Sequence, residues 1–174
     1  MKMEEGLDTG PLYLERRTPI GERETAGELA ARLAREGGDL LVETLRRLDA
    51  GGLAGRRQEG EPTVCRTIRR EDGAVDWSLD AEAIARRLRA FTPWPGLHTY
   101  LGGERVKILD AIPASGGSAG EPGTVRWEGG RLVVAAGQDS ALGLERLQRA
   151  GRTPVNGAEF ARAAALPIRF RNAP

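Results

Sequence analysis

The first part of the chain carries leucines three or four positions apart, which is the spacing of one face of a helix. The segment Thr25-Ala26-Gly27-Glu28 has the form of a capping box, in which a hydroxyl and a glutamate satisfy free amides at a helix start. The pattern predicts a helix that begins there and ends at the glycine pair Gly37-Gly38. Leucines within residues 41–48 predict a second, separate helix that closes at Gly51-Gly52.

A further helical pattern lies near the middle of the chain, over about residues 80–90. Ile84, Leu88 and Phe91 fall on one side of this helix, and its arginines fall elsewhere. The run Thr92-Pro93-Trp94-Pro95-Gly96 must end it, because proline lacks an amide hydrogen and disfavours helical geometry in the residue before it.

After residue 98 the apolar period changes to two, as expected for strands. Alternating segments flank Gly102-Gly103 and Gly129-Gly130, and each pair predicts a tight hairpin. Leucines within residues 142–147 predict a fifth strand, and Asn156-Gly157-Ala158-Glu159 predicts a capped short helix. Five short strands with flanking helices fit a small closed barrel of the oligonucleotide-binding (OB) type.

The patterns predict an α+β protein with three parts. Residues 1–53 hold the leucine helices, and residues 73–174 hold the barrel. Residues 54–72 open on a stretch of Gly, Pro and charged residues with no apolar period, and we interpret them as an exposed linker.

Composition narrows the class of protein. The apolar runs are too short for a membrane span, and the first residues do not form a signal peptide, so we expect a cytoplasmic protein. With one cysteine and one histidine we expect no internal disulfide and no metal cluster. Residues 1–53 have 8 basic and 11 acidic side chains, whereas residues 54–174 have 18 and 14, so the second part is the better surface for a polyanion.

The strongest candidate for chemistry is Asp8, in the segment Gly6-Leu7-Asp8-Thr9-Gly10-Pro11. A carboxylate enclosed by glycines and followed by the apolar residues 12–14 is typical of a tight loop beside a strand. Loops of this kind often carry catalytic groups. A carboxylate by itself catalyses little, so the question is whether its partners are present.

Several segments together resemble methionyl-tRNA formyltransferase. The glycine loop 6–11, the helical leucines, Val75-Asp76-Trp77 and Arg89-Ala90-Phe91-Thr92-Pro93-Trp94-Pro95-Gly96 occur in that family's order and approximate spacing, over most of the chain. The resemblance implies a Rossmann-like domain that binds 10-formyltetrahydrofolate, a linker, and a barrel that helps hold the initiator tRNA. The family transfers a formyl group to the amino group of methionyl initiator tRNA.

The family's catalytic trio is an asparagine and a histidine from an Asn-x-His segment, together with the aspartate of the glycine loop. Only Asp8 has a counterpart here; His98 has no asparagine two residues before it. Residues 1–53 therefore resemble the end of a catalytic domain whose folate-binding strands are missing, and we expect the chain to be inactive alone. The alternatives are an internal methionine taken as the start, or a naturally separate barrel protein that works with a separate catalytic half.

Basic residues supply the candidates for tRNA contact. Three lie where the family has a basic linker segment, one lies on the central helix, and two alternate with apolar residues on a strand and should point outward. The same residues could simply be solvated charges. The candidates are Arg66, Arg69, Arg70, Arg89, Arg105 and Lys107.

The tryptophans receive different interpretations. Trp77 and Trp94 are predicted to be core anchors, and Trp127, on a hairpin strand, is weighed as an exposed stacking residue. Two other functions remain open beside tRNA binding. One is a related branch that acts on sugar nucleotides or hydrolyses formyltetrahydrofolate, and the other is a non-catalytic assembly module whose leucine helices dock on a catalytic half.

Overall fold

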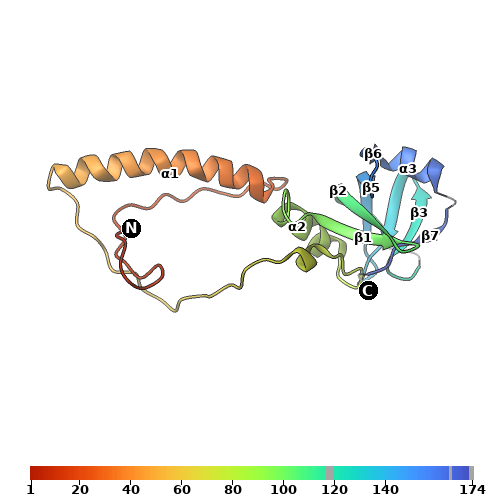
Figure 1. Ribbon diagram of the computed structural model, residues 1–174, viewed down its shortest axis with the longest axis horizontal. Helices are drawn as coiled ribbons and strands as arrows, with labels where there is room; N and C mark the ends of the chain where they lie inside the picture. Colours follow the sequence, from red (N-terminus) through yellow and green to blue (C-terminus); the bar gives the residue numbers. More distant parts are fainter. Residues whose placement is uncertain (117–119, 165, 173–174) are drawn as a thin grey trace. The chain divides into compact units, whose positions relative to one another are not determined.

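The computed structural model describes residues 1–116, 120–164 and 166–172, and Figure 1 labels its helices and strands. The chain divides into two compact units, Met1–Thr67 and Ile68–Pro174. The division falls inside the segment 54–72 that the sequence predicts as a linker.

The first unit contains one long helix, α1 (Ala26–Asp49). Its start has the predicted capping box: the Thr25 hydroxyl accepts a hydrogen bond from the Glu28 amide at 3.3 Å, and the Glu28 carboxylate accepts one from the Thr25 amide at 2.9 Å. The helix ends at Ala50, where Gly51 takes a φ of +69°, a conformation that favours glycine. Both predicted ends are confirmed.

The predicted break at Gly37-Gly38 is wrong, because α1 runs through both glycines. Each glycine costs a helix about 1 kcal/mol relative to alanine, which weakens the helix without forbidding it. The apolar stripe continues on the same side of the helix before and after the two glycines. It includes Leu33, Leu41 and Leu45, which are separated by eight and then four positions. The continuous apolar stripe was therefore a better indicator of where the helix ends than the two glycines were.

Arg32 fastens the segment before α1 to the helix. Its guanidinium donates to the Pro19 carbonyl at 2.8 Å, to the Glu24 carboxylate at 2.8 Å and to the Glu36 carboxylate at 3.1 Å. The hydrogen bonds from Arg32 are the main reason that the pKa of Glu24 falls to about 2. Earlier in the chain, Leu12 forms a single antiparallel bridge with Arg56, where the sequence suggested a strand.

The second unit contains a curled antiparallel sheet with short helices (Figure 1). The five longer strands match the five predicted strands, and two additional strands have two residues each. The elements are η1 (Arg70–Gly73), α2 (Ala81–Ala90), β1 (Leu97–Leu101), β2 (Glu104–Ala114), β3 (Thr124–Glu128), β4 (Arg131–Ala135), β5 (Ala141–Arg149), β6 (Val155–Asn156), α3 (Gly157–Ala163) and β7 (Ile168–Arg169).

The strand order is β1-β2-β5-β4-β3-β7, with β6 paired to β5. Both predicted hairpins are confirmed, and all four turn glycines have positive φ, as the twist of a two-residue hairpin turn requires. Tyr100 of β1 and Arg171, just after β7, exchange backbone hydrogen bonds of 2.9 and 3.2 Å. The two edges of the sheet therefore meet at this bridge.

The core of the second unit is built around Trp77. Its ring stacks on Phe170 with centroids 5.9 Å apart, and its indole N–H donates to the Thr99 hydroxyl at 3.0 Å. Helix α2 contacts β2 and buries Ile84 and Leu88 beneath its polar face. The prediction that Trp77 is a core anchor is confirmed.

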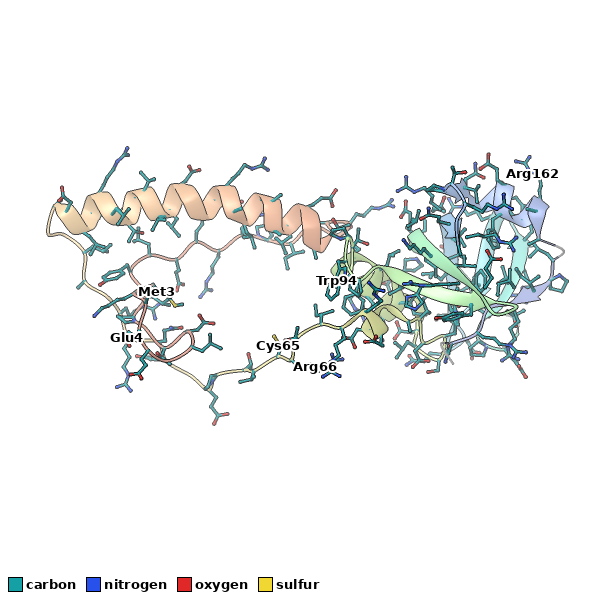
Figure 2. The ribbon with its side chains drawn as sticks, viewed as in Figure 1. Met3, Glu4, Cys65, Arg66, Trp94 and Arg162 are labelled. Atoms are coloured by element: carbon teal, nitrogen blue, oxygen red, sulfur yellow. The ribbon has the colours of Figure 1, made fainter. Side chains whose placement is uncertain are left out.

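Trp94 is different, and its prediction as a core anchor is wrong. It lies on the turn that follows α2, where Figure 2 labels it, and 56% of its surface is exposed. Phe91 and Leu97, which flank this turn, enter the apolar core instead. Periodicity could not show this, because the turn belongs neither to the helix nor to the strand.

Candidate nucleic-acid interface

Strand β2 presents two of the predicted cations on one face. Val106 and Ile108 are buried, with 0% and 2% of their surfaces exposed, whereas Lys107 is exposed and Arg105 is half-buried. Because side chains alternate along a strand, Arg105 and Lys107 share the face opposite the core. Their predicted outward orientation is confirmed.

Arg105 is positioned by the imidazole of His98. The Arg105 guanidinium lies 3.2 Å from His98 Nδ1, and since arginine can only donate, Nδ1 must accept and the ring proton must be on Nε2. His98 is 5% exposed, and its ring meets Tyr100 edge-on with centroids 5.9 Å apart. Burial lowers the pKa of His98, and the nearby Arg105 charge lowers it further, so the ring is neutral at pH 7.

The outward face of β2 continues into a small cavity at the end of β5. The register places Lys107 opposite Gln148, and Arg149 follows at the strand end. The cavity has a volume of about 150 Å³. Its lining consists of Arg105, Lys107, Gln148, Arg149, Ala150 and Gly151.

An acidic side chain, that of Glu104, is paired with the lining residue Arg149. Glu104 accepts a hydrogen bond from Arg149 Nε at 3.0 Å as part of a bidentate ion pair. The hydrogen bonds from Arg149 hold the pKa of Glu104 below its usual value and raise the pKa of Arg149. Glu104 neutralises the charge of Arg149, so the excess positive charge of the cavity lining comes from Arg105 and Lys107.

The other predicted cations lie elsewhere. Arg69 and Arg70 are exposed at the start of η1, where the Asp72 carboxylate accepts from the Arg69 amide at 2.7 Å. Arg66 lies in the extended segment that ends the first unit (Figure 2) and donates to the Thr67 carbonyl at 3.2 Å. Arg89 is half-buried in the last turn of α2. The described structure does not gather these four into the β2–β5 cavity.

Asp8 lies on an exposed loop in a conformation that is unusual for a residue with a side chain, with φ of +54°. The Gln58 amide stabilises the loop by donating to the carbonyls of Asp8, at 2.7 Å, and Gly10, at 2.8 Å. Residues 1–10 enclose a cavity of about 300 Å³ at this loop. In the part of the chain that the structure describes, no side-chain hydrogen bond or ion pair reaches the Asp8 carboxylate.

Sequence reasoning missed Gln148 and Arg149 as members of the site. Neither belongs to a motif, and Arg149 falls at the end of a strand whose leucines alone were predicted. The signal that could have found them is the pairing of β2 with β5, which brings together residues about forty positions apart. The side chains that the structure describes hold no group of three or more His, Cys, Asp or Glu placed to bind a metal ion. Neither does any helix among the described residues have the length and apolar character needed to cross a membrane.

Comparison with known proteins assigns the family. A model described as the formyl transferase C-terminal domain matches residues 67–165, which is more than half of the chain. The chain belongs to the formyltransferase family. The resemblance to methionyl-tRNA formyltransferase is also confirmed as a similarity. This formyltransferase-family chain is 46% identical, over 165 residues, to a methionyl-tRNA formyltransferase of Anaeromyxobacter dehalogenans (strain 2CP-1 / ATCC BAA-258).

That alignment covers 92% of this chain and 53% of the relative, so the chain spans about half the length of the curated relative that it matches. Solved structures are similar in fold at lower identity. HypX from Aquifex aeolicus, in complex with tetrahydrofolic acid, matches with a TM-score of 0.61 and 18% identity over 90% of this formyltransferase-family chain and 28% of its own. The sugar 3N-formyl transferase WlaRD matches with a TM-score of 0.62 and 14% identity, over 87% of this chain and 53% of its own.

Proposed function

We propose that this chain supplies the tRNA-binding, carboxy-terminal part of a methionyl-tRNA formyltransferase. The complete enzyme would transfer formyl from 10-formyltetrahydrofolate to the amino group of methionyl initiator tRNA, in the cytoplasm. The observation that carries the proposal is the 46% identity over 92% of the chain to an enzyme of that name. In this reading residues 1–53 are a remnant of a Rossmann-like catalytic domain, and residues 73–174 are an OB-like barrel.

The charges of the second unit support an RNA role. Arg105 and Lys107 extend from one face of β2 and line the β2–β5 cavity together. Phosphate contacts dominate the affinity of proteins for nucleic acids, and arginine and lysine supply most of them. We propose that Arg66, Arg69, Arg70 and Arg89 add further phosphate contacts along the same RNA.

Asp8 would act only together with other catalytic groups, and the given sequence contains no Asn-x-His segment. In an acyl transfer the attacking amine must lose a proton, and the tetrahedral oxyanion needs donors aimed at it. An aspartate can orient a histidine and stabilise its charged form, but it carries neither the proton nor the oxyanion. We propose that Asp8 has this supporting role, beside an asparagine and a histidine supplied from elsewhere, and that folate binds mostly outside this chain without a metal.

The test of the RNA role is a titration of the purified chain with initiator tRNA at several salt concentrations. Each neutralised phosphate contributes about −0.7 to −0.9 to the slope of log affinity against log salt, so several contacts predict a steep fall. A flat salt response would contradict the role. A competition experiment separates this function from the sugar-formyltransferase branch. Uncharged initiator tRNA should displace bound tRNA from the chain, and a sugar nucleotide should not.

A second candidate function is that of an assembly module, and α1 favours it. No residue of α1 is buried, and its apolar stripe includes Leu33, Leu41, Val42 and Leu45, all exposed, with Leu41 at 58%. An apolar helix face of this kind gains stability by packing on another surface. We propose a folate-binding catalytic half as the partner. Co-purification with such a half would support this function, and a monodisperse monomer that captures none would contradict it.

A further inference from the structure

The cavity between β2 and the end of β5 differs from an ordinary solvated surface in how its donors are arranged. Its volume of about 150 Å³ is more than one water needs, so it has room for one small oxyanion. Its lining includes Arg105, Lys107 and Gln148, whose side chains share the outward face of the β2–β5 pair and carry a guanidinium, an ammonium and a carboxamide. These are the donor types that recognise phosphate, and arginine does so with a planar fork.

Arg105 is held in the cavity wall before any ligand arrives. Its guanidinium meets a neutral His98, a buried residue of β1 that is opposite Lys107 in the strand register. Its Nε atom is buried and has no hydrogen-bond partner among the described residues. A buried donor without a partner is uncommon in native structures and calls for a specific cause, such as a functional constraint, an ordered water or an ion.

The charge balance favours an anion. The residues that line the cavity include no acidic one among those described, and the carboxylate of the neighbouring Glu104 is already engaged by Arg149 through Nε at 3.1 and 3.0 Å to its two oxygens. Arg105 and Lys107 therefore leave the cavity with excess positive charge. None of the described residues that line it is aromatic, so the lining offers no platform for stacking a base.

We propose that this cavity is an oxyanion subsite that holds one backbone phosphate of the bound RNA. The ligand class rests on the proposed tRNA-binding function, whereas the oxyanion subsite rests on the cavity itself. Lys107 and Arg105 pair with the phosphate oxygens, and Gln148 donates a neutral hydrogen bond. Because the lining contacts no base edge, the subsite positions the RNA and does not read its sequence.

The first experiment tests the subsite without RNA. The full chain, labelled with ¹⁵N, is titrated with inorganic phosphate at constant ionic strength, with sodium chloride as the reference salt. We expect saturable amide shifts at Lys107, Ala150 and Gly151 that chloride does not produce. Shifts that are absent, or equal in both salts, would overturn the oxyanion subsite.

The second experiment uses initiator tRNA and matched variants. Lys107→Gln removes an exposed charge, and Arg131→Gln removes another exposed charge, at the start of β4 and outside the cavity lining. We expect Lys107→Gln to weaken binding about tenfold near 0.1 M salt and to reduce the salt slope by about 0.7 to 0.9, with Arg131→Gln close to the unaltered chain. Lys107→Arg, which keeps the charge, should restore most of the affinity.

The outcomes separate the two claims. Equal weakening by Lys107→Gln and Arg131→Gln, with tight binding by the unaltered chain, would overturn the subsite and leave tRNA binding intact. If phosphate shifts the cavity amides but the unaltered chain does not bind tRNA, the proposed function and the RNA ligand fail, while the oxyanion subsite stands. Circular dichroism of both variants, expected to be unchanged, shows that the fold is preserved.

Discussion

At the scale of single residues, His98 determines how Arg105 is presented. The chain has one histidine, and the structure places it beneath the candidate interface with the role of an acceptor for the guanidinium. Protonation would put a second positive charge 3.2 Å from Arg105 in a buried position. The lowered pKa of His98 reflects that cost, chiefly through burial and then through Arg105.

This pKa predicts how stability depends on pH. The unfolded chain takes up a proton on His98 near its ordinary pKa of 6.5, whereas the folded chain does so only at lower pH. The free energy of unfolding should therefore fall as pH drops below 6.5, and level off below the folded-state pKa. Asp76 and Glu104, whose pKa values are lowered below 3.8 and 4.5, contribute only at more acidic pH.

Urea denaturation of the chain at pH 7.5 and at pH 5.5 measures this effect. His98→Gln is the control, because glutamine can still accept from Arg105 but does not titrate. The unaltered chain should lose stability between the two pH values and the variant should lose less. An equal loss in both would assign the pH dependence to other groups.

At the scale of elements, the sheet is joined to α2 by a close approach of two backbones. A Cβ atom at Gly137, after β4, would lie 1.8 Å from the Ser78 carbonyl oxygen. The Gly137 amide donates to the Leu79 carbonyl at 2.8 Å, and the Ser140 hydroxyl accepts from the Ala81 amide at 2.8 Å. These contacts hold the start of α2 on the sheet, so glycine at 137 is required by space.

Gly137→Ala should destabilise the second unit by about 2 kcal/mol, the cost of forcing extra volume into a well-packed contact. Gly38→Ala is the matched control, because a Cβ there meets nothing within 4 Å, and it should stabilise α1 by about 1 kcal/mol instead. Urea unfolding followed by the fluorescence of the tryptophans, all in the second unit, measures the first change, and helical circular dichroism the second. An unchanged midpoint for Gly137→Ala would mean that the two backbones are not in contact.

At the scale of the whole molecule, the sequence contains no Asn-x-His segment to act with Asp8. Asp8 lies on a loop of the first unit, and His98 belongs to the second unit, where it is committed to Arg105. The purified chain, supplied with 10-formyltetrahydrofolate and charged initiator tRNA, should therefore show no formyl transfer above the uncatalysed rate. Turnover by the chain alone, measured as formylmethionyl-tRNA formed, would refute the assignment of Asp8 as a lone supporting group.

Local sequence signals determined much of the fold of this protein. The capping box at Thr25, the hairpins at Gly102-Gly103 and Gly129-Gly130, and the outward alternation of Arg105 and Lys107 were all predictable, because neighbours in sequence establish them. The wrong element boundary at Gly37-Gly38 arose from giving two weak helix residues more weight than the continuous apolar phase around them.

The tertiary structure decided which side chains become neighbours in space. Gln148 and Arg149 join Arg105 and Lys107 only through the pairing of β2 with β5, and Trp94 is exposed only because α2 and β1 take the apolar residues on either side of it. Alternation along one strand shows which way a side chain points, but its neighbours depend on register with strands that are distant in the sequence. The family could therefore be identified from motifs, whereas the β2–β5 cavity required the folded sheet.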